Sequence, residues 1–280
     1  MDHRIVCESS GFYRAVARQQ LRGNWVNGAI AAAIFVVITG VMDFVVMNLM
    51  NNQATVFLSG IYAWLVFGPA IVGLYAYYMN LVRGQNPSIG NCFEGFERFG
   101  RAFLLGLFMI LFIVLWTMLF IIPGIVAAYR YSLAPMLLRD RPELGALDCI
   151  RESKRLMTGN KSSMFVLDLT FLGWMILASV PMIVVQTILM VNGGDVNYMM
   201  EYQPDFIDSV ILLVSQIPLL WVFAYNYTAK VVFYEEVIKP VPQPHMEYTR
   251  YTGEESRELP EEQKSSESRE RNEENDEADH

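Results

Sequence analysis

Two ionisable residues lie inside apolar stretches of this sequence and are its first candidates for chemistry. Arg130 stands in the apolar segment 125–138, and Asp168 lies near the start of the apolar segment 164–191. Burying a charge among apolar groups is costly, so such residues are expected to pair or to serve a function. Helical rise would place both at a similar depth, and the sequence therefore predicts an intramembrane ion pair between Arg130 and Asp168.

Three interpretations of this pair stay open from the sequence. The two side chains could form a neutralised pair that fixes a short segment in place. They could also form a relay for protons or for a substrate. In the third interpretation they do not pair, and the long Arg130 side chain extends back to the membrane interface.

Two further polar groups could contact a ligand or a neighbouring helix. The basic amphipathic segment 143–161 is typical of a surface that binds anionic lipid headgroups or phosphate, although its charge also fits the ordinary excess of Lys and Arg in cytoplasmic loops. Asn226 and Thr228 form a polar patch in the last apolar stretch and predict interhelical hydrogen bonds. The candidate lipid-binding cations are Lys154, Arg155 and Lys161.

Sequence motifs of enzyme chemistry are missing. The sequence contains no Gly-x-Ser-x-Gly, Gly-x-x-x-x-Gly-Lys or His-Glu-x-x-His motif. Its three cysteines form no Cys-x-x-Cys pair, and its three histidines lie near the ends of the chain. We therefore expect a non-enzymatic protein with no catalytic residues, no metal site and no cofactor.

The composition is that of a membrane protein with an acidic tail. Hydrophobic residues make up 53% of the chain and charged residues 18%, against about 25% charged residues in a typical soluble domain. Residues 251–280 contain twelve acids and four bases, which leaves seventeen of each in the rest of the chain. The net charge of −8 therefore belongs to the tail, and no nucleic-acid partner is expected.

Long apolar stretches must position the candidate residues. A bilayer-spanning helix needs about 20 apolar residues, and the sequence predicts an all-α bundle with six membrane segments. Segment 125–138 is short, about 21 Å at helical rise, so it either crosses with a tilt or is re-entrant after a turn at Pro123-Gly124. The six predicted segments are 25–50, 56–82, 103–122, 125–138, 164–191 and 209–234.

The remaining segments complete the predicted organisation. Residues 1–23 are predicted to form an amphipathic segment at the membrane surface, 24–239 the helix bundle, and 240–280 a disordered charged tail. Amphipathic interfacial helices are also predicted near 91–101 and 143–157.

The distribution of basic residues predicts the orientation. Short cytoplasmic loops collect Lys and Arg. A hairpin at Pro123-Gly124 would place every basic segment on one side of the membrane, so both termini are predicted to be cytoplasmic. The cysteines would then lie on the reducing side, where no disulfide is expected. The basic segments are 1–23, 83–101, 139–161 and the residues from 239 onward, whereas 51–55 and 192–208 contain no Lys or Arg.

Several short motifs resemble one known family. The chain resembles the bacterial integral-membrane family called domain of unknown function 975 (DUF975) over roughly residues 10–235. The resemblance implies a multi-pass protein of the bacterial cytoplasmic membrane and no agreed activity. The residues that carry it are Leu21-Arg-Gly-Asn-Trp25, Leu115-Trp116, Ile121-Ile-Pro-Gly-Ile125, Tyr129-Arg-Tyr-Ser-Leu-Ala-Pro135, Ser153-Lys154, Leu156-Met-Thr-Gly-Asn-Lys161, Phe171-Leu-Gly-Trp174 and Phe233-Tyr234.

The sequence leaves three functions open. The first is a non-enzymatic structural or accessory envelope protein, in contact with the bilayer and with anionic phospholipid headgroups. The second is a transporter or permease subunit for a small molecule or a lipid, and the third is a lipid-modifying enzyme. An internal cavity lined by the candidate polar residues would favour transport, whereas a filled interior would favour the first function. The sequence does not indicate a membrane-protein partner or an oligomeric state.

Overall fold

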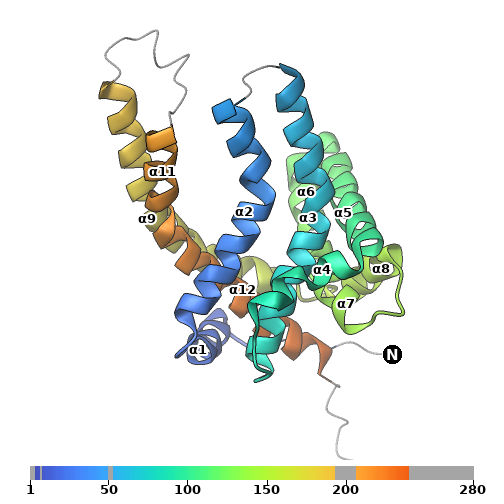
Figure 1. Cartoon of the computed structure of the whole chain (residues 1–280). Coiled ribbons are helices and arrows are strands. Elements are labelled where there is room, and N and C mark those ends of the chain that lie inside the picture. The colour runs from blue at the N-terminus through green and yellow to red at the C-terminus, as the bar shows by residue number, and fades with distance from the viewer. Residues whose placement is uncertain (1–3, 7, 50–52, 193–205, 240–280) are drawn as a thin grey trace, which may run out of the picture. The chain divides into compact units, whose positions relative to one another are not determined.

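The computed structural model describes residues 4–6, 8–49, 53–192 and 206–239 (Figure 1). All regular structure in these ranges is helical, which confirms the predicted all-α class for the described residues. They belong to one compact unit, Met1–Lys239. The predicted disordered tail, 240–280, lies outside the described residues.

The first three helices are α1 (Ser10–Gln20), α2 (Trp25–Leu49) and α3 (Gln53–Val82). α1 meets the following helix at 103°, whereas α2 and α3 pack side by side (Figure 1). The Tyr78 hydroxyl donates a 2.8 Å hydrogen bond to the backbone oxygen of Gly28. This bond satisfies a fully buried phenol and joins α2 to α3.

An aromatic cluster joins these helices to the last one, α12 (Ile217–Ile238). The Tyr227 ring of α12 stacks on Tyr78 with centroids 6.0 Å apart. It meets Tyr75 edge to face at 5.5 Å and Phe35 at 6.5 Å. Such geometries add favourable energy beyond the burial of apolar area, so the cluster stabilises the contact between α2, α3 and α12.

A short irregular segment lies directly against α3. It comprises the 3₁₀ helix η1 (Ile89–Phe93) and α4 (Glu94–Glu97). A Cβ atom at Gly73 of α3 would lie 1.9 Å from a backbone oxygen of η1, and one at Gly95 of α4 would lie 2.0 Å from a backbone oxygen of α3. The two segments therefore pack backbone against backbone, which fixes the position of Glu94.

The helices α5 (Phe99–Leu119) and α6 (Ile121–Tyr131) form the expected hairpin. The predicted turn at Pro123-Gly124 is wrong, because the chain turns at Phe120, whose backbone is extended with φ −158° and ψ 146°. Pro123 lies in the first turn of α6, where its missing N–H would have no helical partner in any case. Gly124 serves the packing instead, since a Cβ there would lie 2.1 Å from a threonine hydroxyl of α5.

Two short helices follow, α7 (Ala134–Asp140) and α8 (Ala146–Leu156). Ser153 of α8 connects them to the break between α6 and α7. Its hydroxyl donates to the backbone oxygen of Arg130 at 2.8 Å and accepts from the backbone N–H of Leu133 at 3.2 Å. One buried hydroxyl therefore satisfies two backbone groups that the break would leave unpaired.

We expect Ser153→Ala to destabilise the protein by about 1–3 kcal/mol, because it leaves a buried N–H without a partner. In detergent this should lower the melting temperature by roughly 3–6 °C. Ser162→Ala is the matched control, since Ser162 is exposed. Equal melting temperatures for the two variants would show that the Ser153 hydroxyl does not stabilise the break.

The C-terminal part contains α9 (Lys161–Asn192), α11 (Phe206–Ser215) and α12. α9 packs against both α11 and α12. The predicted segment 209–234 is divided at Gln216, where α11 has ended and α12 begins. Pro218 falls in the first turn of α12, a position that proline favours, so the division follows from the sequence at that point.

Four helical stretches of the described residues are long and apolar enough to cross a membrane. A fifth candidate is the bent combination of α1 with residues 25–41 of α2. Length and composition therefore support four to five of the six predicted segments. The helix α12 is not among these stretches; it contains the polar residues Asn226 and Lys230, which lower its mean hydropathy. The four stretches are Phe57–Val82, Phe99–Leu119, Ile121–Asp140 and Lys161–Leu189.

The segment predicted as 125–138 is longer than the sequence indicated. Because the turn lies at Phe120, residues 121–124 join the second arm of the hairpin, and α6 with α7 forms a stretch of 20 residues, Ile121–Asp140. At helical rise this is about 30 Å, the thickness of a bilayer core. The short predicted length resulted from placing the turn too late.

Candidate functional site

Asp168 is at the centre of a polar cluster between three helices, α6, α9 and α12. Its Oδ1 lies 3.1 Å from Lys230 Nζ and accepts a 3.1 Å hydrogen bond from Asn226 Nδ2. Asn226 and Lys230 are four residues apart on α12, which places them on one face of that helix. The Tyr129 side chain of α6 lies close to Asp168. We call Asp168, Lys230, Asn226 and Tyr129 the Asp168 cluster.

The predicted pair between Arg130 and Asp168 is wrong. Among the described residues Asp168 pairs with Lys230, and Arg130 takes part in none of the ion pairs. Tyr129 is the residue of α6 that faces α9, with its ring 5.8 Å from that of Phe165. The next helical residue points about 100° away, so Arg130 is directed elsewhere, and its Nε is buried without a hydrogen-bond partner.

Asn226 and Thr228 are both buried, at 3% and 0% exposure, but they have different partners. Asn226 bonds across to Asp168 of α9. Thr228 donates to the backbone oxygen of Ala224 at 2.7 Å, within its own helix. The structure therefore brings Asn226 together with Asp168 and leaves Thr228 outside this cluster.

The candidate lipid-binding cations lie on and beside α8. Lys154 is exposed on α8, and Lys161 is half-buried at the start of α9. Arg155 donates to Glu152 at 2.7 and 2.8 Å. This guanidinium is the main reason that the pKa of the Glu152 carboxyl lies below its ordinary value. Arg155 is therefore already paired, whereas the exposed Lys154 is open to an external anion.

A second polar group, not predicted from the sequence, joins the ends of several helices. Arg83, directly after α3, holds Asp140 with two hydrogen bonds of 2.7 and 2.6 Å. Its Nε also donates to Glu235 at 2.8 Å. The Tyr234 hydroxyl donates to Asp140 at 2.8 Å. α3, α7 and α12 are thus connected through one guanidinium, which is the most specific geometry available to an ion pair.

Arg139 makes the equivalent connection between α7 and α4. It donates to Glu94 at 3.0 Å and to the Asn80 side chain at 2.6 Å. Asn91 of η1 donates to the other oxygen of Glu94 at 2.5 Å. We call these two sets of contacts the Arg83–Arg139 network. Its signal in the sequence was the position of both arginines at the ends of apolar stretches.

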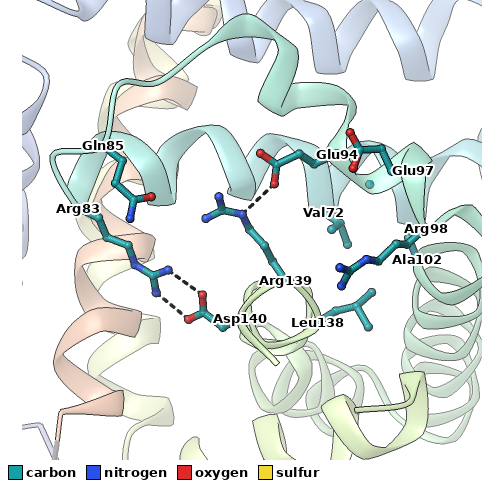
Figure 2. Close-up of a pocket in the computed structure, with 11 residues that line it drawn as sticks. Val72, Arg83, Gln85, Glu94, Glu97, Arg98, Ala102, Leu138, Arg139 and Asp140 are labelled. Carbon is teal, nitrogen blue, oxygen red and sulfur yellow. Dashed lines mark hydrogen bonds and ion pairs between the residues drawn. The ribbon is translucent and has the colours of Figure 1, made fainter. Parts of the chain in front are cut away.

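A pocket of about 350 Å³ adjoins this network. Figure 2 shows the side chains of Arg83, Arg139 and Arg98 around it, with Asp140 and Glu94 in contact with two of these arginines. Apolar lining comes from three residues. They are Val72, Ala102 and Leu138.

Cys92 and Cys149 are buried and free. Burial raises the pKa of each thiol to about 11, so neither forms the reactive thiolate at neutral pH. We expect both to resist a maleimide in the native protein and to react after unfolding in SDS, which intact-mass measurement would detect. Fast labelling of the native Cys7→Ser variant would contradict their burial.

The arrangement of the helices and of their polar contacts indicates a class of protein but no particular activity. The described residues form an all-helical unit with four to five helices apolar enough to cross a membrane, and their polar side chains join helices to one another. The family model described as "Protein of unknown function (DUF975)" matches residues 9–129 and 118–240. The chain belongs to this family. No curated protein and no solved structure matches the chain.

Proposed function

We propose that this protein is a non-enzymatic, membrane-embedded helical bundle with a structural or accessory role in the bacterial cytoplasmic membrane. The observation that carries the proposal is that Asp168, the acid inside an apolar helix, is held by Lys230 and Asn226. In a bilayer, polar groups that satisfy one another stabilise helix association. A site that takes up substrate would need such groups to be open to it.

The proposal places the Arg83–Arg139 network and α8 at the cytoplasmic surface, with both termini on that side. Basic residues then face the cytoplasm, and the exposed Lys154 can contact anionic headgroups. Cell fractionation tests the membrane assignment, since an embedded bundle stays in the pellet during alkaline extraction. Release into the supernatant would contradict it.

The alternative is a transporter or permease subunit, and one observation bears on it. The helices α6–α7 and α11–α12 are interrupted, and interrupted helices line the binding sites of many transporters. Here, however, the Ser153 hydroxyl satisfies backbone groups on both sides of the α6–α7 break. The break is therefore closed by the protein itself, which favours the structural role.

A charge swap tests the role of the Asp168 cluster. We expect Asp168→Lys and Lys230→Asp each to lower the melting temperature by roughly 4–8 °C, because each puts two like charges together inside the bundle. The double variant should recover at least half of that loss. Thermal unfolding in the same detergent measures all three.

Proton flux distinguishes a structural pair from a relay. Liposomes that contain the wild type or Asp168→Asn should pass protons across an imposed pH gradient no faster than empty liposomes, as reported by an enclosed pH-sensitive dye. Faster flux through the wild type that Asp168→Asn abolishes would overturn the structural proposal and favour transport.

A further inference from the structure

The pocket beside the Arg83–Arg139 network lies where three candidate membrane spans end. Arg83 directly follows the span Phe57–Val82, Arg98 directly precedes Phe99–Leu119, and Asp140 is the last residue of Ile121–Asp140. All three residues line the same pocket. In the membrane-embedded bundle proposed above, on which this inference rests, the pocket is therefore at the depth of lipid headgroups.

The charges around the pocket balance, with three arginines and three acids. Four of these six residues are already paired: Arg83 with Asp140, and Arg139 with Glu94. Arg98 and Glu97 have no ion-pair partner among the described residues and are both exposed. Figure 2 shows the Arg98 guanidinium beside Val72 and Leu138, at the edge of the pocket.

We propose that this pocket binds a group that joins a phosphate to a primary amine, as the phosphoethanolamine headgroup of a membrane lipid does. Arg98 holds the phosphate, because a guanidinium matches the geometry of phosphate oxygens. Glu97 accepts from the ammonium group. A pocket with no net charge and one open residue of each sign complements a zwitterion better than it complements a net anion.

An apolar groove of about 670 Å³ lies on the same two helices, α3 and α5. Trp64 and Leu65 of α3 and Phe103 and Leu107 of α5 line it. Phe103 directly follows the pocket residue Ala102, and Leu65 lies about two helical turns from the pocket residue Val72, toward the apolar part of its span. An acyl chain extending from the pocket has an apolar surface there, which favours a lipid as the source of the headgroup.

Native mass spectrometry of the delipidated full-length protein in detergent tests the proposal. The probes are phosphatidylethanolamine, phosphatidylcholine and phosphatidylglycerol with identical acyl chains. Wild type is expected to bind phosphatidylethanolamine about tenfold more tightly than the other two. The quaternary choline nitrogen has no N–H to donate to Glu97, and the glycerol headgroup carries no cation.

Two variants distinguish the role of Arg98 from that of Glu97. Arg98→Gln should weaken binding of phosphatidylethanolamine and phosphatidylcholine alike, each by about tenfold, because both contain the phosphate. Glu97→Gln should reduce phosphatidylethanolamine binding to the level of phosphatidylcholine and leave phosphatidylcholine unchanged. Arg151→Gln on α8 is the control, since its side chain is 75% exposed and lies outside the pocket lining.

Competition by soluble phosphoethanolamine identifies the source of the ligand. No displacement of the lipid at millimolar concentration supports a lipid ligand, whereas displacement with equal affinity supports a soluble zwitterion in the same pocket. Equal binding of all three lipids by the wild type, or unchanged binding by both variants, would overturn the proposal. Tighter binding of phosphatidylglycerol than of phosphatidylethanolamine by the wild type would show an anion site instead. These results are independent of alkaline extraction, which tests membrane insertion alone.

Discussion

Arg83→Met is expected to destabilise the protein by about 2–3 kcal/mol and to lower its melting temperature by roughly 5–10 °C. The substitution keeps much of the side-chain volume but removes the cation between Asp140 and Glu235, so two carboxylates lose their shared partner. The expected loss is smaller than for a fully buried pair, because these side chains are 18–26% exposed and solvent screens part of the interaction.

Two variants control this prediction. Arg151→Met removes an exposed arginine that pairs with Asp148 and should change stability by less than about 0.5 kcal/mol. Adding Asp140→Asn to Arg83→Met should recover part of the loss, since the second change removes one unpaired carboxylate. Thermal unfolding in detergent provides all values. If Arg83→Met unfolds at the temperature of Arg151→Met, the network does not stabilise the bundle.

Gly73→Ala is expected to be the second large effect. The new methyl group would lie 1.9 Å from the backbone oxygen of Cys92, so η1 and α4 must move away from α3. Overpacking of this kind costs about 1–3 kcal/mol. The displacement would also separate Glu94 from Arg139 and expose the Cys92 thiol.

Melting temperature and thiol labelling together measure the effect of Gly73→Ala. The matched control is Gly60→Ala on the same helix, where a Cβ meets nothing within 4 Å and alanine favours the helix by about 1 kcal/mol. We expect the melting temperature to fall only in Gly73→Ala, and Cys92 to react with maleimide only there. Rapid labelling of Cys92 in both variants, or in neither, would contradict the close packing of η1 on α3.

The long helices could be predicted from the sequence because their signal is local. Apolar stretches such as 56–82 and 164–191 are long enough to be recognised by length alone, and both became continuous helices. The turn in the hairpin was placed three residues too late. Proline and glycine are typical of turns, but proline is also common in the first turn of a helix. Only the packing of Gly124 on α5 shows that Pro123-Gly124 belongs to the helix and not to the turn.

The contacts between polar side chains were less predictable, because they depend on the direction in which each side chain points as well as on its depth in the membrane. Arg130 and Asp168 have similar expected depths, yet Tyr129 occupies the face of α6 that meets α9. The spacing of Asn226 and Lys230 was a usable signal, since residues four apart share a helix face. The contacts of Arg83 with Asp140 and Glu235 join residues 57 and 152 positions apart, and no local pattern predicts such pairs.

Cysteine accessibility tests directly whether the Arg83–Arg139 network and α8 of a membrane-embedded bundle lie on the cytoplasmic side. In the Cys7→Ser background, single cysteines replace Lys154 on α8 and Ile121 at the turn of the α5–α6 hairpin, both exposed positions. A membrane-impermeant maleimide is applied to spheroplasts and to inverted vesicles. We expect Lys154→Cys to react only in inverted vesicles and Ile121→Cys only in spheroplasts. Reaction of both cysteines from the same side would contradict it.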